Sequence, residues 1–174
     1  MSFRSQAERE LQFFDCYRTI IDDDVTDLEV TLSFSLHAID ERLLSSMCCR
    51  ASKGISFVLK GAMSLPQSSV AIIVKHVSPK LKKITVNDCS NISWTDIKPI
   101  LAAADYVEVL DLRRNIWVDD YVIEQLAIKF AKSMRALLLE NSDLSDASLF
   151  HVGRRCLKLR HINFDCCYKV GLLL

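Results

Sequence analysis

The chain has 174 residues, half of them hydrophobic and a quarter charged, and its 22 basic side chains balance 22 acidic ones. This is a globular composition, and the neutral balance leaves no net field to draw the chain to nucleic acid or an anionic membrane. No apolar run approaches the roughly 18 residues of a membrane span, and the N-terminus is too charged for a signal peptide. We therefore expect an intracellular protein, cytoplasmic or nuclear, with its seven cysteines reduced.

Residues 1–27 have the pattern of an amphipathic helix. Leu11, Phe14, Tyr17 and Ile21 recur at helical spacing within this segment. The segment falls outside the repeats that follow, and its apolar side is expected to cover the first of them as an N-terminal cap.

Residues 28–80 are interpreted as two degenerate repeat units, whose register comes from constant steps of 26 back from Leu81. These steps place Leu32 and Phe34 at the apolar fourth and sixth strand positions of the first unit. In the second unit they place Val58 at the fourth position and Lys60 at the sixth, where an apolar residue is expected. Degeneracy is common in terminal repeats. Helical spacing follows each strand, over residues 40–53 and 67–77.

Four clear units follow in residues 81–174. Each has apolar residues at positions one, four and six and a small polar or thiol side chain at position nine. The units begin at residues 81, 107, 134 and 159, in steps of 26, 27 and 25. Helices are expected over residues 96–104, 119–131 and 145–156. The four sets are Leu81, Ile84, Val86 and Cys89; Val107, Leu110, Leu112 and Asn115; Met134, Leu137, Leu139 and Ser142; and Leu159, Ile162, Phe164 and Cys167.

Each unit therefore consists of a strand, a turn, a helix and a return, and it can bury its apolar face only by stacking on its neighbours. Because helices are wider than strands, we expect an α/β solenoid of about six units, with a concave parallel sheet and outer helices. The last unit stops after its strand and is incomplete. We therefore expect that the chain is a fragment or a splice form, or that something else covers this end. If the end stays open, we expect marginal stability or self-association.

The units resemble the cysteine-containing class of leucine-rich repeats, familiar from F-box/LRR substrate receptors of cullin ubiquitin ligases. The matching segments are Leu81 through Cys89 with the following NIS-W-T-D, and Cys156 through Cys167. The resemblance covers residues 81–170 well and 28–80 weakly, and it implies a leucine-rich-repeat horseshoe. Residues 28–53 also resemble the later part of an F-box, with a Leu-Leu pair before Cys-Cys-Arg. They lack its Leu-Pro opening and a Trp after the Cys-Arg, so we prefer the repeat interpretation.

No constellation of side chains indicates catalysis, a metal site or a cofactor. The adjacent pairs Cys48-Cys49 and Cys166-Cys167 lack the C-x-x-C spacing of zinc and redox sites. The four histidines fall in different units, and four scattered glycines form no phosphate-binding loop. The position-nine side chains are expected to turn inward and hydrogen-bond the loop backbone. We therefore expect a protein that is not an enzyme.

Strand residues that alternate with the buried ones should line the concave face, where solenoids commonly bind partners. Because Arg is enriched in interface hot spots, Arg113 and Arg114 are the first choices among these residues. The full set of predicted partner-binding residues is Lys83, Thr85, Asn87, Asp111, Arg113, Arg114, Leu138, Glu140, His161, Asn163 and Asp165.

Three functions are compatible with these features. The first is an adaptor that binds a protein partner through the concave face, and the second is a substrate-receptor subunit of a cullin-type ubiquitin ligase. The third is a structural or assembly subunit of a larger complex, held through the open C-terminal edge.

Overall fold

The computed structural model describes residues 27–31, 41–50, 56–62, 65–76 and 81–171. The predicted capping helix lies outside this part of the chain, except that Asp27 is the first residue of a strand. Leu32 and Phe34, which were assigned to the first unit, also lie outside it.

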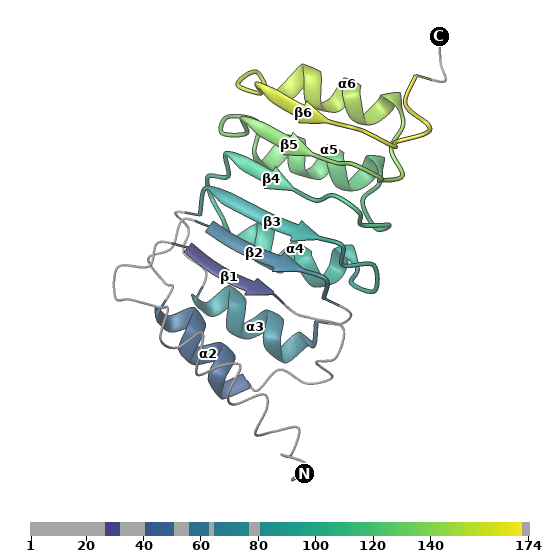
Figure 1. Ribbon diagram of the computed structural model, residues 1–174. Coiled ribbons are helices and arrows are strands. Elements are labelled where there is room, and N and C mark those ends of the chain that lie inside the picture. The colour runs from purple at the N-terminus through teal and green to yellow at the C-terminus, as the bar shows by residue number, and fades with distance from the viewer. Residues whose placement is uncertain (1–26, 32–40, 51–55, 63–64, 77–80, 172–174) are drawn as a thin grey trace.

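Strands and helices alternate along the chain. Among the described residues, six strands form one parallel sheet in sequential order (Figure 1). The strands are β1 (Asp27–Thr31), β2 (Ser56–Lys60), β3 (Lys83–Asn87), β4 (Val109–Asp111), β5 (Ala136–Leu138) and β6 (His161–Asn163). The helices are α2 (Glu41–Arg50), α3 (Gln67–His76), α4 (Trp94–Ala103), α5 (Asp120–Lys129) and α6 (Asp146–Arg155).

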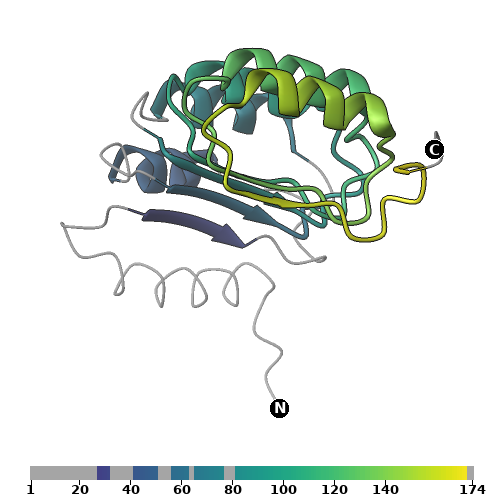
Figure 2. The same cartoon turned by 90° about the horizontal axis from the view of Figure 1, so that it is seen from above.

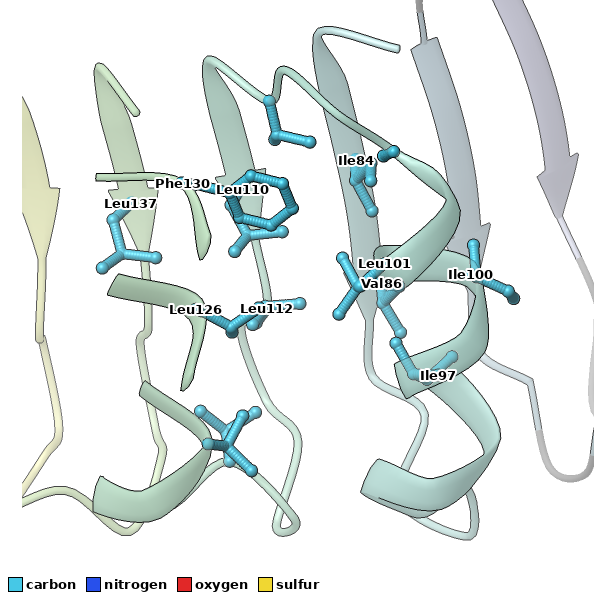
Figure 3. Close-up of a cluster of buried hydrophobic side chains, with 14 of the residues drawn as sticks. Ile84, Val86, Ile97, Ile100, Leu101, Leu110, Leu112, Leu126, Phe130 and Leu137 are labelled. Carbon is cyan, nitrogen blue, oxygen red and sulfur yellow. The ribbon is translucent and has the colours of Figure 1, made fainter. Parts of the chain in front are cut away.

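The helices line one face of the sheet, as Figure 2 shows. The hydrophobic core fills the space between the two layers. Strand residues such as Ile84, Val86 and Leu110 meet helix residues such as Ile97 and Leu126 there (Figure 3). All five are at most 2% exposed, so the alternate strand residues point to the opposite face of the sheet.

Polar side chains fix where the helices begin. The Asp119 carboxylate accepts a hydrogen bond from the Val122 N–H at 2.9 Å, which satisfies a donor in the first turn of α5. Ser145 caps α6 in the same way through the Ala147 N–H at 3.2 Å. Helix α4 begins at Trp94, two residues before the predicted start at residue 96, so Pro99 lies inside the helix beyond its first turn.

The register of the first two units differs from the prediction. Phe57 and Leu59, each 1% exposed, occupy the buried strand positions of β2 and pair with Ile84 and Val86. Lys60 instead lies at an exposed position, and β1 places Leu28 opposite Phe57. The spacing from Phe57 to Ile84 is 27 residues and that from Leu28 to Phe57 is 29, so a constant step of 26 failed. A slip of one residue exchanges the buried and exposed faces of a strand.

A second line of backbone hydrogen bonds runs beside the strand ends. Gly61, Asp88, Arg114 and Asn141 each adopt a left-handed conformation, with φ between 56° and 62°. The N–H of each donates to a carbonyl of the next unit, over distances from 2.8 to 3.2 Å. Cys166 has the same conformation, with φ of 59°, at the equivalent place in the last described unit. Successive units therefore join in the same way beyond the short strands.

Candidate functional site

We define the open sheet face as the side chains of β3 to β6 and the residues just after them that point away from the helices. Parallel pairing aligns Lys83 with Val109, Ala136 and His161 across the four strands. The next row aligns Thr85 with Asp111, Leu138 and Asn163. Asn87, Arg113, Glu140 and Asp165 follow at the strand ends. The fold therefore brings together the residues that were predicted to bind a partner.

These residues differ in how far solvent reaches them. Lys83, Arg114, His161 and Asp165 are exposed. Thr85 and Asp111 are only 4% and 6% exposed, so neither is accessible enough to contact a partner directly. The remaining five, which are partly exposed, are Asn87, Arg113, Leu138, Glu140 and Asn163.

The buried Asp111 carboxylate holds the Arg113 side chain in place. Arg113 Nε donates to Asp111 Oδ1 at 2.9 Å, and a terminal guanidinium nitrogen donates to Asp111 Oδ2 at 2.8 Å. Asn87 Nδ2 lies 3.4 Å from the same Oδ2 and donates to it. The hydrogen bond with Asp111 raises the pKa of Arg113. These two hydrogen bonds fix the plane of the guanidinium group and hold its positive charge next to the Asp111 carboxylate.

Glu140 neutralises much of the remaining positive charge. One of its carboxylate oxygens lies 3.3 Å from Arg114, and the other lies 3.8 Å from Arg113. Arg114 is the more accessible arginine, with 61% of its side chain exposed against 35% for Arg113. Of the two arginines, Arg114 is therefore the freer to meet a partner, and Arg113 is the more rigid.

A further ionic row lies at the strand starts and was missed from the sequence. Glu108 lies 3.2 Å from Arg135 and 4.0 Å from Lys82 in the neighbouring units. Backbone bonds from Glu108 N–H to the Lys82 carbonyl and from Arg135 N–H to the Glu108 carbonyl align the three. All three occupy position two of their units, so comparing that position across the repeats would have revealed the row.

Three of the four position-nine side chains, Cys89, Asn115 and Cys167, turn inward and bond the loop backbone as predicted, whereas the buried Ser142 Oγ has no partner among the described residues. Asn115 Nδ2 donates to the carbonyls of Val86 at 2.7 Å and Leu112 at 2.8 Å. Cys167 Sγ donates to the Leu139 carbonyl at 3.1 Å. Burial raises the pKa of the Cys167 thiol, which keeps it protonated and unreactive. The position-nine side chains that form these hydrogen bonds therefore join successive units beneath the open sheet face.

Among the described residues, no three His, Cys, Asp or Glu side chains gather closely enough to hold a metal ion. No helix in this part of the chain has the length and apolar character needed to cross a bilayer.

Neither a known family model nor a curated protein sequence matches the chain. Among solved structures, a chain in the crystal structure of the Rad7 and Elc1 complex in yeast is similar to this one, with a TM-score of 0.55 and 14% sequence identity. The match covers 90% of this chain and 55% of the other, so this chain spans about half the length of the structure that it matches. At this identity the likeness concerns the fold alone, and it supports an α/β arrangement of the leucine-rich-repeat kind.

Proposed function

We propose that this protein is a non-catalytic adaptor that binds a protein partner through the open sheet face, the concave face of a leucine-rich-repeat solenoid, inside the cell. The observation that carries the proposal is the ionic cluster on that face. A buried carboxylate, Asp111, orients the Arg113 guanidinium toward Glu140 while most of Arg114 remains accessible.

Such a cluster suits a protein partner with both acidic and apolar side chains. Because Arg113 is already held by two hydrogen bonds, binding orders it at little additional entropic cost. Leu138, which is partly exposed in the middle row, offers an apolar contact between the charged rows. Arginine is enriched in interface hot spots, so we expect the two arginines to contribute most of the binding energy.

The test compares two charge-reversal pairs on opposite sides of the molecule. One variant carries Lys83→Glu and Arg114→Glu on the open sheet face, where both side chains are exposed. The matched control carries Lys98→Glu in α4 and Lys132→Glu after α5, which are also exposed. Proteins captured from cells by each variant and by the wild type are measured by quantitative mass spectrometry.

We expect the open-face variant to lose its specific partners by about tenfold or more, while the control retains them and both keep the wild-type circular dichroism spectrum. Partners that the two variants retain equally would overturn the assignment to this face. Loss in both variants would indicate a charge effect without a defined surface, and would also overturn it.

A second candidate is a subunit of a cullin-type ubiquitin ligase, as the resemblance to F-box/LRR receptors implies. A similar fold in a chain of the Rad7 and Elc1 complex favours membership in a multiprotein assembly of this kind. The strand pairing of Asp27–Thr31 with β2 favours a repeat over an F-box for that segment. The test is co-purification with the small adaptor that F-box proteins bind. Loss of that binding in a Leu43→Asp, Leu44→Asp variant would support this candidate, and no binding by the wild type would reject it.

A further inference from the structure

Three apolar side chains form a strip across the middle of the open sheet face. Val109 of β4 pairs with Ala136 of β5, and Leu138 follows Ala136 on the same side of β5. All three are partly exposed, whereas Leu110 and Leu137, which point to the helices, are 0% and 1% exposed. Because β4 and β5 lie inside the sheet, between β3 and β6, this exposure does not depend on a sheet edge (Figure 1). We call Val109, Ala136 and Leu138 the apolar strip.

Ionic side chains border the apolar strip on both sides. At the strand starts, Glu108 lies 3.2 Å from Arg135 and 4.0 Å from Lys82. Just after the strands, Glu140 lies 3.3 Å from Arg114. Each row therefore joins neighbouring units through ion pairs within the protein, and the apolar strip lies between the two rows.

The distance between the two ionic rows suits a helix. Arg135 and Glu140 are five residues apart along nearly extended chain, which corresponds to about 16 Å at the usual rise of a strand. An α-helix with its side chains is about 10–12 Å wide. A helix can therefore lie on the apolar strip and direct its own polar side chains toward the two rows.

The spacing of the strands also favours a helix over an extended segment. Neighbouring strands lie about 4.8 Å apart, and one turn of an α-helix rises about 5.4 Å. Apolar residues three or four apart on a helix lying across the strands would thus match successive strands to within about 0.6 Å. In an extended segment, side chains on one face repeat about every 6.6 Å, which exceeds the strand spacing by about 2 Å. Val109 and Ala136, which pair directly across β4 and β5, therefore suit two successive turns of a helix.

The charges beside the apolar strip indicate which side chains the helix carries. In the first three positions of the units that begin at residues 81, 107 and 134, the charged residues are Lys82, Lys83, Glu108 and Arg135. The basic side chains outnumber the acidic one, and exposed Lys83 forms no ion pair with any described residue. At positions seven and eight of the same units, two basic and two acidic side chains balance. A helix with an acidic flank toward the strand starts is therefore complementary to this face.

We propose that the open sheet face binds an amphipathic α-helix of its protein partner, lying across the strands. The helix places apolar residues three or four apart on the apolar strip and acidic residues beside Lys83 and Arg135. This inference rests on the proposed function, since it names the part of the partner that occupies that face. Its tests use an isolated peptide, so the two proposals can fail separately.

Binding of a designed peptide tests the proposal without the natural partner. The probe is a fluorescein-labelled, helix-forming peptide with leucine at every third or fourth position and glutamate along one flank of the leucine stripe. The comparison is a peptide of the same composition in scrambled order, which forms no stripe. Fluorescence anisotropy measures each Kd, and circular dichroism measures helix gained on binding. We expect the striped probe to gain helix and to bind about tenfold more tightly than the scrambled one.

Two variants of the apolar strip and two matched controls locate the binding. Ala136→Tyr would obstruct the strip, and Leu138→Ser would remove its largest apolar side chain, so each should raise the Kd of the striped probe by about tenfold. The controls, Ala71→Tyr in α3 and Ile128→Ser in α5, make the same kinds of change at exposed positions of the helix layer. Both controls should bind the probe as the wild type does.

A charge exchange tests the acidic flank. Lys83→Glu should weaken binding of the striped probe and should strengthen binding of a second probe that carries lysine in place of glutamate on the same flank. A variant that weakens both probes, or neither, would contradict the proposed charge pairing.

Several results would overturn the proposal. They are a wild type that binds neither peptide, equal binding of the striped and scrambled peptides, and binding that both strip variants retain. Binding without a gain of helix would indicate an extended segment and would overturn it as well. If the probe fails while the Lys83→Glu, Arg114→Glu variant still loses its captured partners, the proposed function stands without the helix. If the probe binds the apolar strip while that variant keeps its captured partners, the proposed function fails instead.

Discussion

Asn115 and Ser142 occupy the same position in successive units but differ in their hydrogen bonds. The Asn115 side chain is 0% exposed and bonds four backbone groups of its own and the preceding unit. They are the carbonyls of Val86, Leu112 and Arg113 and the N–H of Cys89. Ser142 Oγ is also buried but has no hydrogen-bond partner among the described residues. Alanine substitution at the two positions should therefore have opposite consequences.

In Asn115→Ala the Val86 carbonyl and the Cys89 N–H lose a partner. Each buried polar group left without a hydrogen bond costs about 1–3 kcal/mol, so we expect the free energy of unfolding to fall by about 3–5 kcal/mol once the small cavity is included. In Ser142→Ala no bond is lost and an unpaired buried hydroxyl is removed. We expect a change within about 1 kcal/mol, in the stabilising direction.

Urea unfolding followed by far-ultraviolet circular dichroism measures both changes. If the slope of unfolding free energy against urea concentration is the same in each variant as in the wild type, the unfolded state has not altered. If Ser142→Ala cost as much as Asn115→Ala, the side chain at position nine would act by filling space and not by hydrogen bonding. A loss below about 1 kcal/mol for Asn115→Ala would refute the argument that its amide joins the units.

Three further predictions concern stability and reactivity. Burial opposes ionisation of Asp120, but hydrogen bonds from two serines of the next unit outweigh it and lower its pKa. Asp120→Asn should therefore cost about 1–2 kcal/mol at neutral pH, and this difference in urea midpoints should shrink as the pH falls below about 4, through the lowered pKa. Leu112→Ala should cost about 2–5 kcal/mol in the same assay, because the side chain is 0% exposed. Leu157→Ala, at 85% exposure, should stay within about 0.5 kcal/mol. In thiol titration with a disulfide reagent at pH 8, exposed Cys166 should react well before Cys48, whose pKa burial raises to about 11; equal rates would contradict the burial.

The clear units could be predicted because their apolar residues recur at a nearly constant step. Ile84, Leu110, Leu137 and Ile162 align across four strands, as the sequence indicated. The first two units could not be registered in this way, because the steps of 27 and 29 residues that relate them to β3 and to each other differ from the assumed 26. In β2 the sequence places Val58 between two other apolar residues, so alternation alone does not identify Phe57 as the inward residue.

The candidate site was predicted as a set of positions but not as a set of contacts. Alternation along the strands indicates which side chains share a face. It does not reveal that Asp111 is buried beneath its own neighbour Arg113, because a residue's exposure depends on the side chains around it. The charge of Arg113 is for this reason largely balanced within the protein, and Arg114 is the better target for mutagenesis.

The sequential order of the strands has a mechanical consequence. Because each unit bonds only to the units beside it, a force applied to the two ends of the molecule would not meet all the strands at once. It would peel the units away one after another from the ends of the sheet. Among the strands β3 to β6, β6 is the least firmly held, because its Ile162 is 40% exposed. The protein would therefore lengthen by one unit at a time under force, and its middle units would stay folded until the outer ones had separated.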